Sequence, residues 1–151
     1  AVVLVLLALV LAAAAAFLLL RPASGPVVDP AAVDYSIPGY DNPDGSERGR
    51  IRVPTYSAWT MEAGSDTVEV PLVNTEGNPC YMKFAVKLKG SGEVLYESGL
   101  VPPGKAVPEI RLNRPLEAGT YPVAVEISTF SLDDPEQPLN GAQMGTEITA
   151  S

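Results

Sequence analysis

An alternating apolar pattern over residues 120–127 most constrains what this chain can fold into. Every second position carries a large apolar or aromatic side chain, namely Tyr121, Val123, Val125 and Ile127. Successive side chains of a β-strand point to opposite faces, so this period of two predicts a strand with one buried face. Because such a strand needs a second layer to pack against, the rest of the chain has to supply the other wall of the core.

The remainder of residues 50–151 repeats this period in short runs that are separated by turn residues. The predicted runs are residues 50–54, 57–62, 67–73, 81–89, 93–97, 106–112 and 143–149. No run carries apolar residues at helical spacing over three turns. With the run at 120–127, the pattern predicts an all-β fold, an immunoglobulin-like two-sheet sandwich of seven or eight strands.

Local signals add detail to this predicted sandwich. Residues 81–89 are expected to turn Met82, Phe84, Val86 and Leu88 inward. Gly90-Ser91-Gly92 predicts a hairpin to residues 93–97, and Pro71 predicts a bulge or a sheet edge within 67–73. Tyr121, just after the turn at Ala118-Gly119, matches the tyrosine corner of immunoglobulin-like sandwiches.

The first 20 residues are apolar without interruption, and Arg21 ends the run. At 1.5 Å rise per residue, about 20 helical residues cross a hydrocarbon core roughly 30 Å thick. A cleaved secretory signal is the alternative, but its apolar region is usually about 7–15 residues long. We therefore predict an uncleaved single-pass anchor over residues 1–21, inserted in the cell membrane through residues 1–20, with the C-terminal domain extracytoplasmic.

Residues 22–49 are rich in proline and glycine. The prolines are Pro22, Pro26, Pro30, Pro38 and Pro43. Proline favours the extended polyproline II conformation and removes backbone donors, so the composition predicts a semi-extended linker. The predicted domain division is thus an anchor at 1–21, a linker at 22–49 and a sandwich at 50–151.

Composition excludes several function classes. Lys and Arg number 10 against 18 Asp and Glu, which gives a formal charge of −8 and argues against nucleic acid as a partner. There is no His, which removes the commonest general base and metal ligand. Cys80 is the only cysteine, so no intramolecular disulfide forms. We expect no catalytic residues, no cofactor and no bound metal.

Two motifs resemble ligand-binding loops but lack residues that those loops require. Gly99–Lys105 approaches a phosphate-binding P-loop, but Ala106 replaces the required Ser or Thr, and two prolines remove cradling N–H groups. Aligning Gly45 with the sharp turn of an EF-hand puts Tyr40 and Ile51 where carboxylates are needed. A loop at Asp133, Asp134 and Glu136 leaves two interpretations open, a calcium site or a solvated acidic turn.

Four residues are tentative ligand contacts: Trp59, Tyr81, Lys83 and Lys87. Exposed aromatic rings stack on sugars, and the lysines, continued by Lys89, form a basic stripe that suits an anionic wall polymer. The alternatives are a core position for Trp59 and a solvated sheet face whose lysines block edge pairing. Cys80 is expected to be a small buried residue, with a free reactive thiol as the alternative.

Five short runs resemble a group of small membrane-anchored envelope proteins of Gram-positive gut bacteria. They are GNPCY (77–81), GEVLYESGL (92–100), PLEAGTY (115–121), SLDD (131–134) and PLNGA (138–142). The resemblance covers roughly residues 50–150 and implies a surface-facing β-sandwich without catalytic residues.

Taken together, these observations predict a non-enzymatic cell-envelope module for protein binding or assembly, in which an exposed sheet edge recruits a partner strand or a second copy. Carbohydrate or wall-polymer binding is the alternative.

Overall fold

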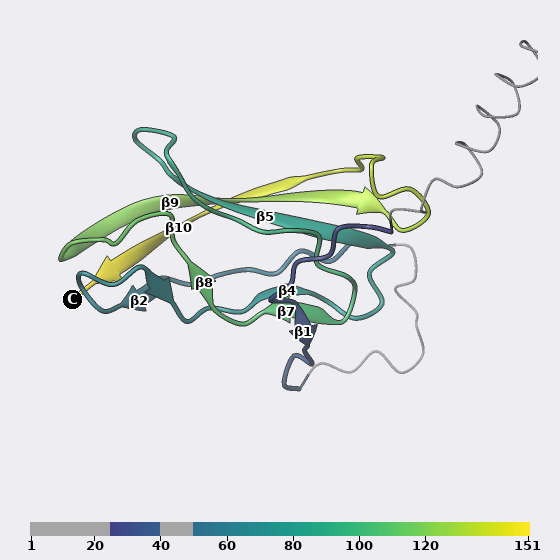
Figure 1. Ribbon diagram of the computed structural model, residues 1–151, viewed down its shortest axis with the longest axis horizontal. Coiled ribbons are helices and arrows are strands. Elements are labelled where there is room, and N and C mark those ends of the chain that lie inside the picture. The colour runs from purple at the N-terminus through teal and green to yellow at the C-terminus, as the bar shows by residue number, and fades with distance from the viewer. Residues whose placement is uncertain (1–24, 40–49) are drawn as a thin grey trace, which may run out of the picture.

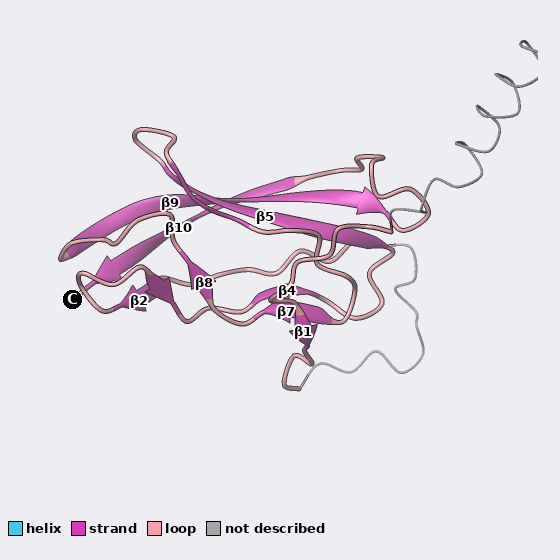
Figure 2. Ribbon diagram, in the orientation of Figure 1, coloured by secondary structure: helices cyan, strands magenta, loops and turns pink. Residues whose placement is uncertain are grey.

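The computed structural model describes residues 25–39 and 50–151, and these residues form strands and loops without a helix (Figures 1 and 2). The strands are β1 (Val33–Asp34), β2 (Trp59–Met61), β3 (Thr67–Val68), β4 (Leu72–Asn74), β5 (Cys80–Leu88), β6 (Val94–Glu97), β7 (Lys105–Val107), β8 (Ile110–Arg111), β9 (Gly119–Ser131) and β10 (Ala142–Ala150). The described ranges hold no helical segment with the length and hydrophobicity of a membrane span. The predicted anchor, residues 1–21, lies outside them.

A five-stranded sheet forms one layer, in the order β2-β10-β9-β5-β6. The strand predicted from residue 120 is its centre, β9, which pairs antiparallel with β10 on one side and β5 on the other. The predicted inward face is confirmed: Val123, Val125 and Ile127 are buried on β9. Phe84 lies opposite Ile127 and is also fully buried. The predicted β5–β6 hairpin and the last strand are confirmed too.

The second layer is more fragmented than predicted. It consists of a three-stranded sheet, β1-β7-β4, and a separate pair, β3-β8, which makes ten described strands in three sheets. The run predicted at 67–73 divides on either side of Pro71 into β3 and β4, and the run at 106–112 divides at Pro108 into β7 and β8. Proline has no N–H for a ladder, which agrees with β7 ending just before Pro108 and β4 beginning just after Pro71.

Residues 50–54, predicted as the first strand, belong to no strand in the structure. The Asn78 side chain takes the place of a ladder: its amide donates to the Arg52 carbonyl (2.9 Å), and its carbonyl accepts the Arg52 N–H (2.8 Å). Asn78 also donates to the buried Asn74 amide oxygen at 2.8 Å. The Asn78 side-chain amide thus satisfies the backbone of this half-buried segment, which a hydrophobic period does not reveal.

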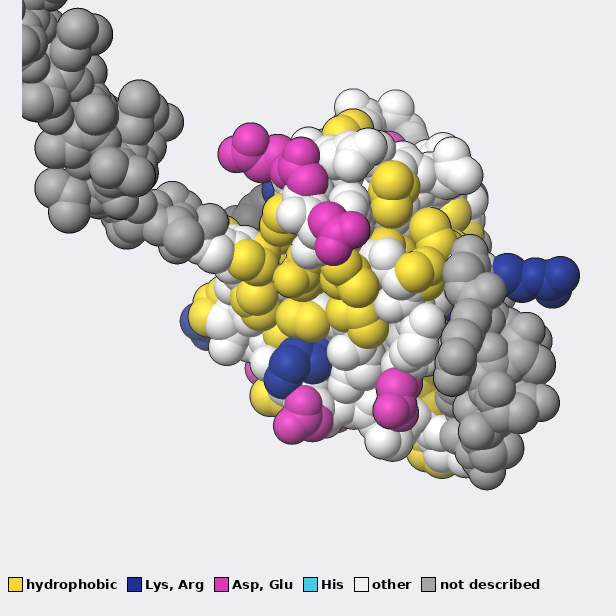
Figure 3. Space-filling model, turned by 90° about the vertical axis from the view of Figure 1, so that its right-hand side faces the viewer, with side chains coloured by type: hydrophobic (Ala, Val, Ile, Leu, Met, Phe, Trp, Pro, Cys, Tyr) yellow, Lys and Arg dark blue, Asp and Glu magenta, His cyan; other side chains and the backbone are white. Residues whose placement is uncertain are grey.

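Part of the predicted linker is folded onto the domain. We call residues 26–35 the strap. Val28 bridges parallel to Leu100, and β1 pairs with β7. Asp29 is 8% exposed, and its carboxylate accepts the Gly99 N–H at 2.7 Å. The domain therefore begins within the range predicted as linker, at the end of the sandwich where apolar side chains gather in Figure 3.

The predicted tyrosine corner is present. The Tyr121 hydroxyl donates to the Glu117 carbonyl at 2.9 Å, four residues upstream. This hydrogen bond fixes how the chain turns into β9, so the alternation of the central strand starts with its buried face toward the core.

Replacing Gly99 by Ala should detach the strap. A Cβ at Gly99 would lie 2.9 Å from the Asp29 Cα, which is backbone and has no rotamer to adopt. Such overpacking costs about 1–3 kcal/mol of unfolding free energy. Gly90→Ala is the matched control, because its Cβ meets nothing within 4 Å. Hydrogen exchange should accelerate at Asp29 and β1 in Gly99→Ala alone; equal exchange in both variants would contradict this role of the strap.

Candidate functional site

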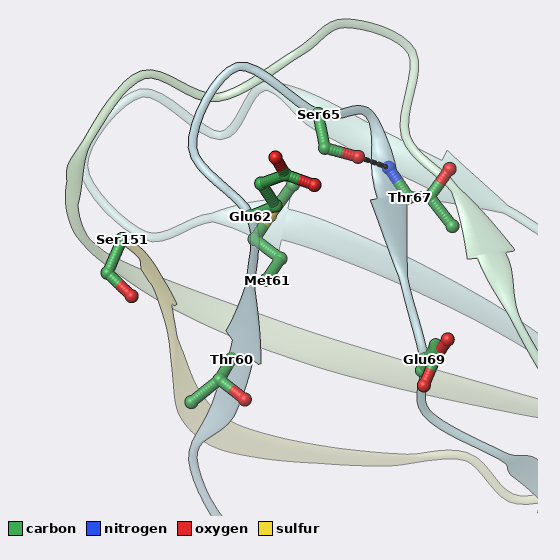
Figure 4. A pocket seen from close by; sticks show the side chains of 7 residues that line it. All are labelled: Thr60, Met61, Glu62, Ser65, Thr67, Glu69 and Ser151. Carbon is green, nitrogen blue, oxygen red and sulfur yellow. Dashed lines mark hydrogen bonds between the residues drawn. The ribbon is translucent and has the colours of Figure 1, made fainter.

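The most unusual feature of the fold is an open seam between β2 and β3. These consecutive strands lie side by side in Figure 4, yet they belong to different sheets and each pairs with another strand on one side only. A hollow of about 520 Å³ opens between them. We call it the seam groove, and it is lined by Thr60, Met61, Glu62, Ser65, Thr67, Glu69 and Ser151.

The loop between β2 and β3 is tied to Leu116 by two backbone hydrogen bonds. Gly64 donates to the Leu116 carbonyl at 2.7 Å, and Leu116 donates back to the Ser65 carbonyl at 3.1 Å. Gly64 has a φ of 80°, a left-handed conformation that glycine adopts without strain. The side chains of Trp59 and Val68 are buried, which anchors each strand to the core.

Backbone groups of β2 face the seam groove. Ser151 donates to the Met61 carbonyl (3.1 Å), and Ala63 donates to the Ser151 carbonyl (3.2 Å), so these residues turn their backbone toward the β10 side. In a β-ladder, the residues that alternate with these along the strand, such as Thr60 before Met61, direct their N–H and C=O to the opposite side. The groups of Thr60 therefore point into the groove.

The same alternation applies to β3. Leu112 donates to the Asp66 carbonyl at 2.7 Å, and Val68 lies opposite Ile110. The backbone of Thr67 consequently faces the groove, where its N–H is bound by the Ser65 hydroxyl at 3.0 Å (Figure 4). The groove is thus bounded by the edges of β2 and β3. On β3, the Thr67 N–H already donates to the Ser65 hydroxyl.

Two exposed carboxylates, Glu62 and Glu69, line the groove from opposite walls (Figure 4). Within the described ranges neither makes an ion pair, whereas the nearby Asp66 pairs with Arg111 at 3.2 Å. Like charges on facing walls disfavour direct pairing of β2 with β3, and their field attracts positive charge.

The structure places Trp59 in the core, 5% exposed, with the Tyr56 ring edge-on at 5.6 Å between centroids. A ring so enclosed has no face free for a sugar, so the core alternative describes it and the ligand-contact hypothesis does not. Its Nε1 has no hydrogen-bond partner among the described residues. Burial also raises the pKa of the Tyr56 hydroxyl above its ordinary value.

The predicted basic stripe lies on β5 and is largely neutralised. Lys83 pairs with Glu97 at 2.6 Å, and Lys87 pairs with Glu126 at 2.5 Å. The hydrogen bond from Lys83 lowers the pKa of the Glu97 carboxyl. Tyr81 is half-buried on the same strand. Because Trp59 is enclosed in the core, the structure does not bring the four predicted contacts together into one site.

Two further sequence hypotheses have structural outcomes. Cys80 is fully buried, as predicted, and burial raises the pKa of its thiol. In the acidic loop, the Asp134 carboxylate accepts the Glu136 N–H at 3.1 Å, which is a local turn. No group of three or more metal-ligating side chains occurs in the part of the chain that the structure describes.

The seam groove was not predicted from the sequence. Its hydroxyl and carboxylate residues read as ordinary strand and turn positions, and the only local signal was the break at Pro71. The groove arises because consecutive strands join different sheets, which is a tertiary property.

Comparisons with known proteins assign this chain to no family. No protein-family model matches this chain, and no curated protein matches it either. Among solved structures, the chain is similar to CopC from Methylosinus trichosporium OB3b, with a TM-score of 0.38 and 17% sequence identity, over 64% of this chain and 85% of that one.

Trp59 is the only tryptophan, so its fluorescence reports the core position directly. We expect blue-shifted emission that acrylamide quenches weakly in the native protein and strongly after unfolding in guanidinium. Efficient quenching before unfolding would show that the indole is accessible and would restore Trp59 as a candidate ligand contact.

Proposed function

We propose that this chain is a membrane-anchored, extracytoplasmic protein-binding module that captures an extended segment of a partner in the seam groove. The observation that carries the proposal is the pair of strand edges that border the seam groove, a hollow of about 520 Å³. The uninterrupted apolar run at residues 1–20 supports the anchor. Two packed layers and the corner at Tyr121 support an immunoglobulin-like sandwich.

Strand addition explains how such a groove binds without a deep pocket. A sheet edge offers N–H and C=O groups in a row, and an added strand satisfies them while the alternate side chains give specificity. Thr60 supplies both groups from β2. The hollow lies within the roughly 300–1,000 Å³ that ligand sites usually occupy.

The charge of the groove selects among extended segments. Glu62 and Glu69 are the titratable side chains that line it, and they project from opposite walls. A segment with Lys or Arg at alternate positions would place positive charge beside both carboxylates. An acidic segment would be repelled, also by the net charge of −8.

The module is proposed to be non-enzymatic. The groove combines carboxylates with the hydroxyls of Thr60, Ser65, Thr67 and Ser151. A serine or threonine nucleophile needs an adjacent base such as imidazole, and the sequence has no His. The resemblance of residues 50–150 to envelope proteins agrees with a binding role.

Replacing Thr60 by Pro should weaken capture while leaving the fold intact. Proline removes the N–H that points into the groove, and edge strands tolerate it. The probe is a synthetic peptide of alternating lysine and valine, titrated calorimetrically against the full chain in lipid nanodiscs. Loss of one backbone hydrogen bond should weaken binding by about 5- to 10-fold. Thr60→Val keeps the N–H and should bind normally; equal loss in both variants would exclude strand addition at β2.

Neutralising both groove carboxylates tests the charge preference separately. The Glu62→Gln/Glu69→Gln double variant should bind the same peptide about 2- to 30-fold more weakly, since each exposed ion pair is worth about 0.2–1 kcal/mol. Raising the salt concentration should reduce the difference. Glu117→Gln/Glu147→Gln removes the same charge elsewhere on the surface and serves as the control. If both double variants lose affinity equally, the peptide responds to the net charge of the protein, and the groove carboxylates have no specific role in binding.

A further inference from the structure

One end of the sandwich carries an exposed apolar surface, which we call the apolar end face. Four of the six large hydrophobic side chains with high exposure belong to the start of the strap (residues 26–28) and to the loop after β9; a fifth, Val33, lies farther along the strap. The four are Val27 (81% exposed), Val28 (38%), Leu132 (43%) and Leu139 (41%). Figure 3 looks onto this end and shows a continuous hydrophobic patch.

The patch surrounds a hollow of about 550 Å³. Apolar walls come from the strap at Pro26 and Val27, from Leu100, and from Phe130 and Pro135. Asp134, Glu136 and Lys83 also line it. Exposed apolar patches of this kind mark interaction sites on soluble domains, so a covering partner is expected.

The length of chain before the first described residue indicates what covers this face. Gly25 itself lines the hollow, while the apolar run ends at Leu20. The intervening five residue steps reach about 18 Å at most when fully extended. Because the strap is folded onto the domain, only residues 22–25 of the predicted linker lie between the predicted anchor and the strap.

We infer that the apolar end face rests on the lipid bilayer that holds the anchor; this inference depends on the membrane anchoring proposed above. If residues 1–20 span the hydrocarbon core, Leu20 lies at its boundary. The interfacial layer beyond that boundary is about 5–7 Å thick on each side. A tether of about 18 Å therefore keeps Gly25, and the apolar face around it, within about 13 Å of the bilayer surface.

The chemistry of the face suits the interface of a zwitterionic membrane. Branched aliphatic side chains and Phe130 gain from burial at the boundary between headgroups and acyl chains. Asp133, Asp134 and Glu136 lie in the loop that carries Leu132, and acidic side chains border the patch in Figure 3. These carboxylates are repelled by anionic headgroups, so close contact is expected to weaken as anionic lipid is added.

This placement also orients the proposed binding site. The strap and the apolar end face lie at one end of the sandwich, and β2 and the C-terminus lie at the other (Figure 1). With the apolar end on the bilayer, the seam groove beside Ser151 opens away from the membrane, toward partners in the surrounding space.

Site-specific fluorescence on the full chain tests the contact. Leu132→Cys and Ser151→Cys are labelled with bimane; the native Cys80 is buried and stays unlabelled in the folded protein. Each protein is reconstituted into phosphatidylcholine vesicles with brominated acyl chains. We expect quenching and a blue shift of the label at 132, and neither at 151. Equal fluorescence from the two labels would overturn the inference.

Flotation separates this result from the anchor itself. If the chain does not float with the vesicles, membrane anchoring fails; if it floats while the label at 132 stays unquenched, only the contact fails. Val27→Ser/Leu139→Ser changes two exposed side chains and should abolish quenching at 132 without changing flotation. Replacing part of the phosphatidylcholine by phosphatidylglycerol should reduce the quenching. Unchanged quenching in the Val27→Ser/Leu139→Ser variant would contradict the apolar contact. Unchanged quenching after phosphatidylglycerol is added would contradict the role of the acidic loop.

Discussion

Burial of one face of β9 against the second layer is the interaction on which the rest of the structure depends. Val123, Val125 and Ile127 are fully or almost fully buried, and each such side chain contributes about 1.5–3 kcal/mol relative to exposure. Since no disulfide is possible, stability has to come from this packing. The sheet partners of β9 are set by the same alternation, because a shift of one residue would turn the apolar face to solvent.

The second layer is built from short, interrupted strands, and the seam groove and the apolar end face both depend on how it is assembled. Pro71 and Pro108 lie where its strands are interrupted, and the layer forms two separate sheets opposite β9. The seam groove is the gap left where β3 pairs with β8 instead of β2. The strap completes another part of the layer by pairing β1 with β7, which draws the N-terminal segment onto the domain.

The parts of the fold that could be predicted from the sequence are the strands in which apolar and polar residues alternate. The long strands β5, β9 and β10 were located because their side chains alternate over many residues. The packing of the strap was not predicted because single contacts attach it, and these leave no periodic pattern in the sequence. They are a bridge at Val28, the hydrogen bond from the Gly99 N–H to the Asp29 carboxylate, and a two-residue strand. Likewise, the buried role of Trp59 depended on which face of β2 met the core, and the sequence left both alternatives open.

The extent of the strap bears on the membrane anchoring proposed above. A linker of residues 22–49 in polyproline II conformation would hold the sandwich far from the bilayer and leave its orientation free. Folding residues 26–35 onto the sandwich removes most of that length, and a short tether attached at one end restricts rotation as well as distance. Under the proposed anchoring, the 2.7 Å hydrogen bond from the Gly99 N–H to the Asp29 carboxylate connects the packing of the strap to the direction in which the seam groove faces.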